Sequence, residues 1–413
     1  MTQLVPTAAR PSAVRETFAS PLYRGATVAL FLSGLGFSGA APQIARFLVD
    51  ELHVSLTTAG LYYLTNLTAP VVGYLVGARS DRTGKRLGLF RLCAVAGFLG
   101  WLAIAFSTQA WMPFVISAVV LAFAGAASSQ LFAAIHDDLR ATESPVADGV
   151  TSIVRMALTA GWIVGPVLGA FLAAEFGPRT MLVATAVFTL AQIVPLGFMR
   201  SPGHPAPAAH DEASEGEPQR AVRSRRLRLM LPLLTFTGLY VLVYAGEPIK
   251  YAYLPIYMND DLRLPSVVSG AVIGIQPLVE LILMPVAVVV ARRTGIMRLM
   301  VVGAACGVAA NLCFALTGSA AGMFAGQILM GGVWGVFAGL GIIVAQRLLP
   351  TAVATASAVF MSSTAVASAL GGLTGGLGVA ALGLPHVFVL PAVYAGLATV
   401  GIAVMSRSRH AVA

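Results

Sequence analysis

The feature that most constrains this chain is a series of apolar runs of roughly 20 residues each, which recur between residues 25 and 406. Hydrophobic residues make up 57% of the 413, and charged residues only 10%. A soluble domain carries about 25% charged residues. Because backbone groups in lipid must form hydrogen bonds within their own segment, each run is predicted to be a helix. The sequence therefore predicts an all-α membrane protein with 12 transmembrane helices.

The positive charge of the chain is distributed unevenly between the two sets of loops. A net charge of +9 would also suit a nucleic-acid-binding protein. Most of the 26 lysines and arginines, however, lie in the tails and in alternate loops, and only Arg179 and Arg263 fall in the opposite loops. Basic loops stay in the cytoplasm. We therefore expect a multi-pass protein of the cell inner membrane, with both termini cytoplasmic, contacts to membrane lipids and no nucleic-acid partner.

One long polar stretch divides the apolar runs into two sets of six. Its acidic part and the arginines that follow are too polar to bury a core, so it is predicted to be a linker whose basic end meets anionic headgroups. The predicted order is a cytoplasmic N-terminal tail (1–24), an N-terminal six-helix bundle (25–199), a cytoplasmic linker (200–228), a C-terminal six-helix bundle (229–406) and a cytoplasmic C-terminal tail (407–413).

The two sets of runs resemble each other. Residues 50–52 (Asp-Glu-Leu) follow the first run, and residues 260–262 (Asp-Asp-Leu) follow the seventh. An Arg-Thr-Gly sequence follows both the second run, at 82–84, and the eighth, at 293–295. Internal repeats of this kind are typical of secondary transporters, which bind substrate between the repeats near the bilayer midplane.

The loop after the second run reads Gly-Ala-Arg-Ser-Asp-Arg-Thr-Gly-Lys-Arg at residues 77–86. It resembles the loop signature of the major facilitator superfamily, Gly-x-x-x-Asp-Arg-x-Gly-Arg/Lys-Arg/Lys. The resemblance implies two pseudo-symmetric six-helix bundles that alternate in access. It also implies a gating role for Asp81 and Arg82, which would latch the halves in one access state. Arg82 and Lys85 are expected to pair with acids of the next cytoplasmic loop. The second-half copy has Arg292 where Asp81 stands, so a latch there would be degenerate.

The fifth run contains a second signature, at residues 161–170. It resembles the Gly-x-x-x-Gly-Pro-x-x-Gly-Gly pattern of exporters in the same superfamily and favours export. Close helix packing through small residues explains the pattern equally well. Residues 121–130 lack the arginine found in many proton antiporters, which argues against a generic drug/proton mechanism.

A narrower resemblance is to the sugar efflux transporter family. It rests on Tyr-x-x-Asn at 63–66, Gln-Leu-Phe-Ala at 130–133, Arg155, the Trp-x-x-Gly-Pro sequence at 162–166, and the acid at 280. This resemblance implies that the substrate is bound by Asn66, Gln130, Trp162 and Glu280. It also implies a gating role for Arg155, which we expect to reach the interface or to pair with an acid at 137–138.

Polar side chains within the apolar runs supply further candidates. An ionisable group at the centre of such a helix costs about 2.5–3.5 kcal/mol and is functional by default. Glu280 lies ~18 Å along its helix from Arg292, too deep to reach the interface. We expect Glu280 to bind a sugar hydroxyl or to carry the coupling proton. The alternative is a protonated acid that bonds a neighbouring helix. Gln276, on the same face, is a further substrate-binding candidate.

The seventh run carries Glu247 and Lys250, which are spaced to pair. Glu247, on a face rich in tyrosine, is a candidate for substrate binding. For Lys250 the preferred interpretation is a side chain that extends outward to the membrane interface. In the first run, Gln43 is a candidate substrate ligand, whereas Arg46 is expected to pair with Asp50.

The predicted function is export of sugars or sugar-like small molecules by a proton-coupled antiporter that acts as a monomer. One alternative is a multidrug/proton antiporter. Another, from a different class, is an intramembrane lipid-modifying enzyme, for which the acidic pair at 137–138 is the sole sequence feature. No catalytic residue, cofactor or metal site is predicted. Cys93, Cys306 and Cys313 lie in apolar runs and lack the spacing of metal ligands.

Overall fold

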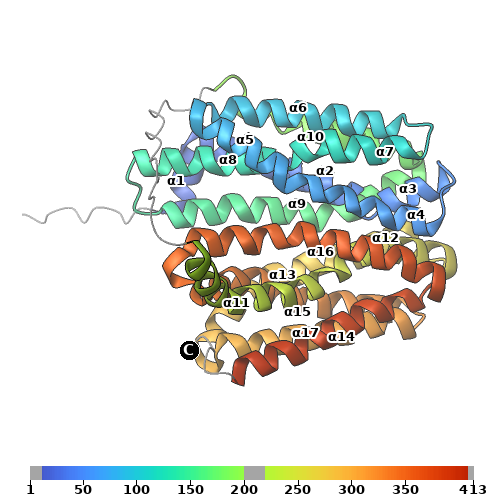
Figure 1. Ribbon diagram of the computed structural model, residues 1–413. Coiled ribbons are helices and arrows are strands. Elements are labelled where there is room, and N and C mark those ends of the chain that lie inside the picture. The colour runs from blue at the N-terminus through green and yellow to red at the C-terminus, as the bar shows by residue number, and fades with distance from the viewer. Residues whose placement is uncertain (1–11, 200–218, 408–413) are drawn as a thin grey trace, which may run out of the picture.

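The structure is a computed structural model that describes residues 12–199 and 219–407, and it is built of helices. Figure 1 shows them packed side by side with their axes running in a common direction. The helices of the first half are α1 (Ala13–Ala19), α2 (Pro21–Ala40), α3 (Ile44–Asp50), α4 (Leu56–Leu61), η1 (Tyr62–Thr68), α5 (Ala69–Thr83), α6 (Arg86–Ala105), α7 (Trp111–Ile116), η2 (Ser117–Leu121), α8 (Ala122–Ala141), α9 (Ala147–Phe176), α10 (Pro178–Ala191) and η3 (Val194–Leu196).

The second half is built in the same way and lies beside the first (Figure 1). Two short segments, η2 and η4, are π-helical, and the other short segments are 3₁₀-helical. The helices of the second half are α11 (Gln219–Tyr244), α12 (Gly246–Ile256), η4 (Tyr257–Asp261), α13 (Ser266–Thr294), α14 (Ile296–Leu316), α15 (Ala320–Leu348), η5 (Pro350–Ala352), α16 (Val353–Leu382), η6 (His386–Phe388) and α17 (Val389–Arg407).

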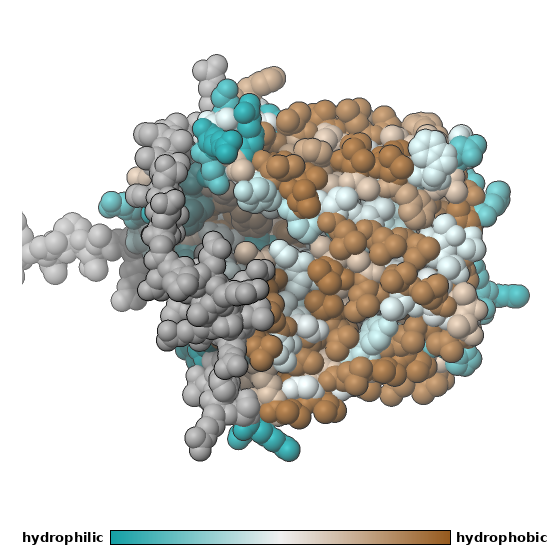
Figure 2. All heavy atoms as spheres, in the orientation of Figure 1, coloured by the Kyte–Doolittle hydropathy of each residue, from teal (hydrophilic) through white to brown (hydrophobic). Residues whose placement is uncertain are grey.

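Eleven helical segments of the described chain are long and apolar enough to cross a membrane. Figure 2 shows a broad hydrophobic band across this face of the bundle, with hydrophilic residues at both ends. The remaining span, second in chain order, is the continuous helical run α4–η1–α5, which is long enough to cross a membrane but less apolar than the other eleven because it carries tyrosines, threonines and Asn66. The predicted all-α fold of twelve membrane spans is therefore confirmed.

Within this span the helix changes to the 3₁₀ form at Tyr62–Thr68, and the side chains there give the reason. Thr65 and Thr68 each donate a hydroxyl hydrogen bond to the carbonyl three residues earlier, at 2.8 and 2.9 Å. Pro70 stands in the first turn of α5 and has no N–H to bond the carbonyl of Asn66. The segment before Pro70 therefore tightens into the 3₁₀ form.

The helices extend past two of the predicted boundaries. Within the predicted tail, α1 is helical and packs against the start of α9, where Ser144 donates to Glu16 at 2.6 Å. Within the predicted linker, α11 already begins at Gln219. The remaining parts of the predicted tails and linker (1–11, 200–218 and 408–413) lie outside the described residues.

The first half is held together by close packing of α2 on α9. Gly161, Gly165 and Gly169 face α2, and a Cβ at Gly165 would lie 1.9 Å from the Ser38 hydroxyl oxygen. That hydroxyl donates to the carbonyl of Gly161 at 3.2 Å. The signature at residues 161–170 therefore serves close helix packing, one of its two interpretations.

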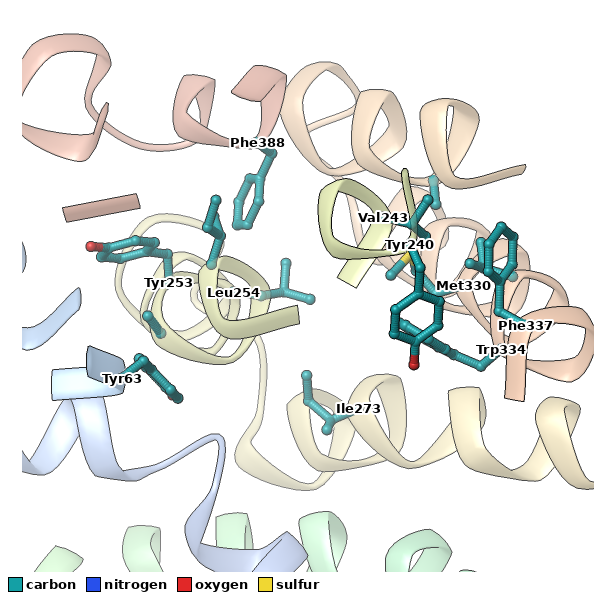
Figure 3. Packing of buried hydrophobic residues seen from close by; sticks show 14 of the residues in the cluster. Tyr63, Tyr240, Val243, Tyr253, Leu254, Ile273, Met330, Trp334, Phe337 and Phe388 are labelled. Atoms are coloured by element: carbon teal, nitrogen blue, oxygen red, sulfur yellow. The ribbon is translucent and has the colours of Figure 1, made fainter. Parts of the chain in front are cut away.

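The core of the second half is rich in aromatic residues. Figure 3 shows Tyr240, Trp334 and Phe337 gathered on one side of the view, with Tyr253 and Phe388 on the other. The ring of Tyr240 meets that of Trp334 edge-on at 6.2 Å between centroids. Tyr253 is fully buried, so it does not belong to an aromatic belt at the membrane surface.

The halves meet along two seams. In one, α13 lies against α9, and Gly274 approaches the carbonyl of Ile163 so closely that a Cβ would lie 2.7 Å from its oxygen. In the other, α16 lies against α4 and η1, where Gly372 and Gly376 face the backbone of α4. Backbones that approach this closely leave no room for larger side chains.

The halves touch at one end of the bundle and separate toward the other. We call the end where α1 begins and α17 finishes the terminal end, and the opposite one the distal end (Figure 1). The α4–η1–α16 seam runs from the distal end to Asn66, whose amide donates to the Ser368 hydroxyl at 2.8 Å. Gly73 and Gly77 continue the face of Asn66 at helical spacing, yet a Cβ on either would meet nothing within 4 Å. The structure is therefore closed distally and open toward the terminal end.

Candidate functional site

A cavity of about 350 Å³ lies on the inner side of the first half. Its volume falls within the range of small-molecule sites, about 300–1,000 Å³. Six membrane spans of the first half contribute to its wall: the polar residues there are Ser33, Thr65, Asn66, Ser117, Ser128, Thr189 and Gln192, and the aromatic ones are Phe37, Tyr62, Tyr63, Trp101 and Trp162. Within the described chain, no charged side chain lines it.

Two irregular helical segments form part of this wall. The 3₁₀ segment η1 contributes Thr65, and the π-helical segment η2 contributes Ser117. Their hydroxyl oxygens lie 3.0 Å apart. Irregular turns within helices are found frequently at functional sites, because they re-aim side chains that a regular helix would place elsewhere.

Aromatic rings give the cavity flat apolar surfaces beside its polar groups. Trp162 is half-buried on α9, and its ring lies 5.6 Å from that of Phe37. Trp101 comes from α6 and is almost wholly buried. Such a lining can bind a neutral solute that has both apolar faces and hydrogen-bonding groups.

A second cavity, of about 420 Å³, continues the first into the space between the halves. The two share Phe37, Asn66 and Ala69 as lining residues. Its other residues come from α5, α11 and α16: Pro70, Tyr244, Met361, Ser362, Thr364, Ala365 and Ser368. The Asn66–Ser368 hydrogen bond therefore stands where the two cavities meet the closed seam.

A buried ion pair lies in the second half. Lys250 is 0% exposed and donates to both carboxylate oxygens of Glu247, at 2.7 and 2.8 Å. Its third donor goes to the side-chain oxygen of Gln276 on α13. Trp334 of α15 donates its indole N–H to Glu247 at 2.7 Å. All the donors of the ammonium group are thus satisfied inside the bundle.

The predicted pairing of Glu247 with Lys250 is confirmed, but the outward orientation predicted for Lys250 is wrong. The spacing of three residues places both side chains on one face of α12. From that face Lys250 bonds Gln276 of α13, and Glu247 accepts from Trp334 of α15, so the cation is held inside the bundle rather than at the membrane interface. Depth along a helix axis does not reveal which face carries the residue.

Glu280 lies close to this ion pair and faces the first half. It is half-buried, and within the described residues it forms no hydrogen bond or ion pair. It is nevertheless near enough to Glu247, Lys250 and Arg155 to interact with their charges. Arg155 comes from α9 of the other half and is exposed. Its predicted pairing with Asp137 or Asp138 is not observed.

Tyr251 connects the neutral cavity with the charged cluster. Its ring lies 6.5 Å from that of Trp162, across the boundary between the halves. The Lys250 ammonium lies 4.6 Å from the centroid of the same ring, a cation–π distance. Tyr251 therefore lies between Trp162, which lines the cavity, and the buried ion pair.

Two predicted ligands stand apart from both cavities. Gln43, at the break between α2 and α3, and Gln130, on α8, are each 4% exposed and line neither cavity. Each has a side-chain oxygen without a hydrogen-bond partner among the described residues. Nearby, Arg46 pairs with Asp50 at 3.0 Å, as predicted.

The basic loop after α5 forms its ion pairs through a residue that the sequence analysis did not single out. Arg86 bonds Asp81 at 2.6 Å and Asp137, at the end of α8, at 2.9 Å. Arg82 and Lys85 form no ion pair with the described residues, contrary to the expected pairing. Gly84 has φ of +64° and caps α5, a conformation that favours glycine. These pairs join helices of the first half only.

The comparison with the predicted site is therefore mixed. Asn66 and Trp162 line the cavity, and Gln276, Glu247 and Glu280 gather with Lys250 in the charged cluster. Among the cavity residues that the sequence analysis missed are Thr65, Trp101, Ser117 and Gln192. The polar run before Pro70 was a usable signal for Thr65, whereas nothing local in the sequence marks the other three. No group of metal-ligating side chains is present among residues 12–199 and 219–407.

Comparisons with known proteins find similar sequences along most of the chain. The family model described as Major Facilitator Superfamily matches residues 26–371. Sugar efflux transporter A of Dickeya chrysanthemi is 27% identical over 352 residues, which cover 85% of this chain and 87% of that protein. A putative sugar efflux transporter of Deinococcus radiodurans is 27% identical over 371 residues, covering 89% and 93%.

Among solved structures, the chain is similar to that of the nucleoside transporter NupG. The TM-score is 0.75 at 17% sequence identity, and the alignment covers 94% of this chain and 100% of that one. At this identity the likeness concerns the fold alone.

Proposed function

The chain belongs to the Major Facilitator Superfamily, and on that premise we propose that it exports sugars or sugar-like small molecules by alternating access. The observation that carries the proposal is the cavity of the first half, in which hydroxyl, amide and aromatic groups are combined without a charged side chain. A sugar presents hydroxyls at its edges and C–H groups on its faces, which match such a lining. The relatives named sugar efflux transporters support the same substrate class.

The direction of transport follows from the orientation that we propose. The terminal end carries Arg86, Arg293 and Arg407, whereas Arg179 and Arg263 lie at the distal end. Basic residues favour the cytoplasmic side, so we place the terminal end in the cytoplasm of a cell whose inner membrane holds the protein. The open cavity then faces the cytoplasm, where a substrate for export would enter.

We further propose that Glu280 carries the coupling proton, with Arg155 as its gating partner. Glu280 is half-buried, has no hydrogen bond within the described chain and interacts with a cation of the other half. A proton that neutralises Glu280 would remove its attraction to Arg155 and so weaken the α9–α13 seam. Proton binding and the opening of that seam would then be linked, as reciprocal coupling requires.

The proposed gate also includes the loop signature of the first half. Asp81 and Arg82 remain gating candidates, and Arg86 joins them because it holds Asp81 and Asp137 together. In this open state the ion pairs stay within the first half. We propose that the loop contacts the second half when the terminal end closes.

Flux measurements in proteoliposomes test the proposal. The purified chain is reconstituted, and sugar-dependent proton flux is recorded with glucose, galactose and lactose, and with ethidium as a cationic dye. We expect proton flux with at least one sugar and none with ethidium. Flux with ethidium alone would instead favour a multidrug antiporter, and no flux with any solute would refute the transport proposal.

Two variants separate coupling from transport. Glu280→Gln should abolish sugar-driven proton flux while sugar counterflow, which needs no proton gradient, continues. Glu143→Gln, which changes an exposed acid at the terminal end, is the matched control and should behave as the wild type. Normal proton flux in Glu280→Gln would remove this residue from the coupling mechanism.

A further inference from the structure

Gln192 stands at the inner wall of the first-half cavity with an unused hydrogen-bond acceptor. It ends α10, is only 2% exposed and lines the cavity. Its side-chain nitrogen donates to the carbonyl of Thr189 at 2.6 Å, which fixes the direction of the amide. Its side-chain oxygen has no partner among the described residues. A buried acceptor left unpaired is costly, so its retention points to a donor that enters the cavity.

The hydroxyl pair Thr65–Ser117 belongs to the same cavity. Thr65 donates its single proton to the carbonyl of Tyr62 at 2.8 Å. Ser117 must therefore be the donor in the 3.0 Å contact between the two hydroxyls. The oxygen of Ser117 then keeps acceptor capacity, and both residues are held by the irregular segments η1 and η2.

Trp101 completes this part of the wall. It lies on α6, is 5% exposed and lines the same cavity as Gln192. Gly97 and Gly100, on the same helix, leave no space for a Cβ, because each would lie 2.7 Å from a neighbouring side chain. The backbone of α6 is thus packed tightly against α8 and α10 around Trp101, which positions its ring firmly.

We propose that these residues form a specificity subsite for one neutral, hydroxyl-bearing ring, with Gln192 as the acceptor for one particular hydroxyl. The inference rests on the proposed function and deepens it, because it names the groups that choose among sugars. Ser117 would accept a second hydroxyl, and Trp101 would lie against apolar C–H groups of the ring. A sugar that lacks the hydroxyl opposite Gln192 leaves a buried acceptor unpaired and is discriminated against.

The test uses deoxy sugars. Counterflow by the wild-type protein is measured in proteoliposomes. Glucose, galactose and lactose, and the monodeoxy analogues of each, are compared as competitors. We expect one deoxy position to weaken binding about tenfold, the factor to which 1.4 kcal/mol corresponds. Methionine is similar in size to glutamine and has no amide. In Gln192→Met the affinity for the parent sugar should therefore fall to the affinity that the wild type has for that analogue. The remaining analogues should keep their order.

The matched control is Gln327→Met. Gln327 is also a fully buried glutamine with an unpartnered side chain, but it lies on α15 and lines neither cavity. This variant should keep the wild-type pattern of deoxy sugars. If Gln192→Met does not give monodisperse protein, Gln192→Asn is measured instead. Its shorter side chain keeps the amide but withdraws it from the cavity, so the affinity for the same parent sugar should fall.

The two proposals fail differently. Absence of flux with every sugar in the wild type refutes the proposed function and the subsite with it. Sugar flux in which Gln192→Met leaves every affinity within twofold of wild type refutes the subsite alone, and would assign the free acceptor to a bound water. Equal weakening of all analogues by Gln192→Met would likewise refute a role in choosing one hydroxyl.

Discussion

The buried ion pair of the second half offers the sharpest test of the structure. Lys250 and Glu247 approach to 2.7 Å with side chains only 1% and 7% exposed. At an effective dielectric constant of about 20, charges at that distance attract by roughly 6 kcal/mol. Burial of each ion costs several kcal/mol, so the net contribution of the pair to stability is small. Removal of one partner, by contrast, leaves a buried charge without compensation.

We therefore predict opposite outcomes for single and double substitutions. Lys250→Met leaves Glu247 with only the indole N–H of Trp334 as a donor, and the free energy of unfolding should fall by about 3–5 kcal/mol. Glu247→Gln should be less harmful, because its amide oxygen can still accept from Trp334 and from Lys250. The double variant Glu247→Gln/Lys250→Met holds no buried charge and should recover to within about 1–2 kcal/mol of the wild type.

Reversible unfolding in mixed detergent micelles, followed by tryptophan fluorescence, measures these differences and gives the coupling energy of the double-mutant cycle. The matched control is Lys85→Met, at a residue that forms no ion pair with the described chain, and its stability should change by less than about 0.5 kcal/mol. Wild-type stability of Lys250→Met, or a double variant as unstable as that single one, would refute the buried geometry.

Three further predictions concern the distal seam, the loop after α5 and a hydrogen bond between the halves. Gly376→Val should disfavour distal closure, because a Cβ there would lie 2.8 Å from the Thr57 carbonyl oxygen; spin labels across the distal end should report longer distances than in the wild type. Arg86→Gln should lower the free energy of unfolding by about 1–3 kcal/mol, whereas Arg82→Gln should change it by less than about 0.5 kcal/mol, and equal effects in thermal unfolding would contradict the observed pairing. Tyr253→Phe, which removes a 3.1 Å hydrogen bond across the halves to the carbonyl of Leu56, should cost about 0.5–1.5 kcal/mol in the same assay.

The fold was predictable because its main determinants are local. Length and apolarity decide whether a segment spans the membrane, and the repeat indicates how spans are grouped. Pairs within one helix turn, such as Arg46 with Asp50, follow from spacing alone. The break in the second span also had a local cause in Thr65, Thr68 and Pro70, but reading the run only for hydropathy concealed it.

The site was less predictable because it depends on which helix faces meet. The sequence analysis singled out Glu280 by its cost in lipid, a property of one residue. It misplaced Lys250, since Gln276, which binds the cation, comes from α13, and Trp334, which binds Glu247, comes from α15. Gln192 was missed for a similar reason. A glutamine near the end of an apolar run is unremarkable until its neighbours are known to leave its oxygen unpaired.

In the proposed mechanism, the arrangement separates two tasks that a proton-coupled exporter must combine. Neutral polar and aromatic groups of the first half line the cavity, whereas the buried charges belong to the second half. Contact between them passes through Trp162 and Tyr251, whose ring also receives Lys250 at 4.6 Å. A cation–π contact such as that of Lys250 with Tyr251 is worth about 0.5–2 kcal/mol. A substrate that shifts the Trp162 ring, and with it the Tyr251 ring, would change the energy of the charged cluster by up to that amount. Coupling needs only such a difference between two states, and it needs no charge on the substrate. Under the proposed mechanism, a neutral sugar can therefore influence Glu280 without touching it.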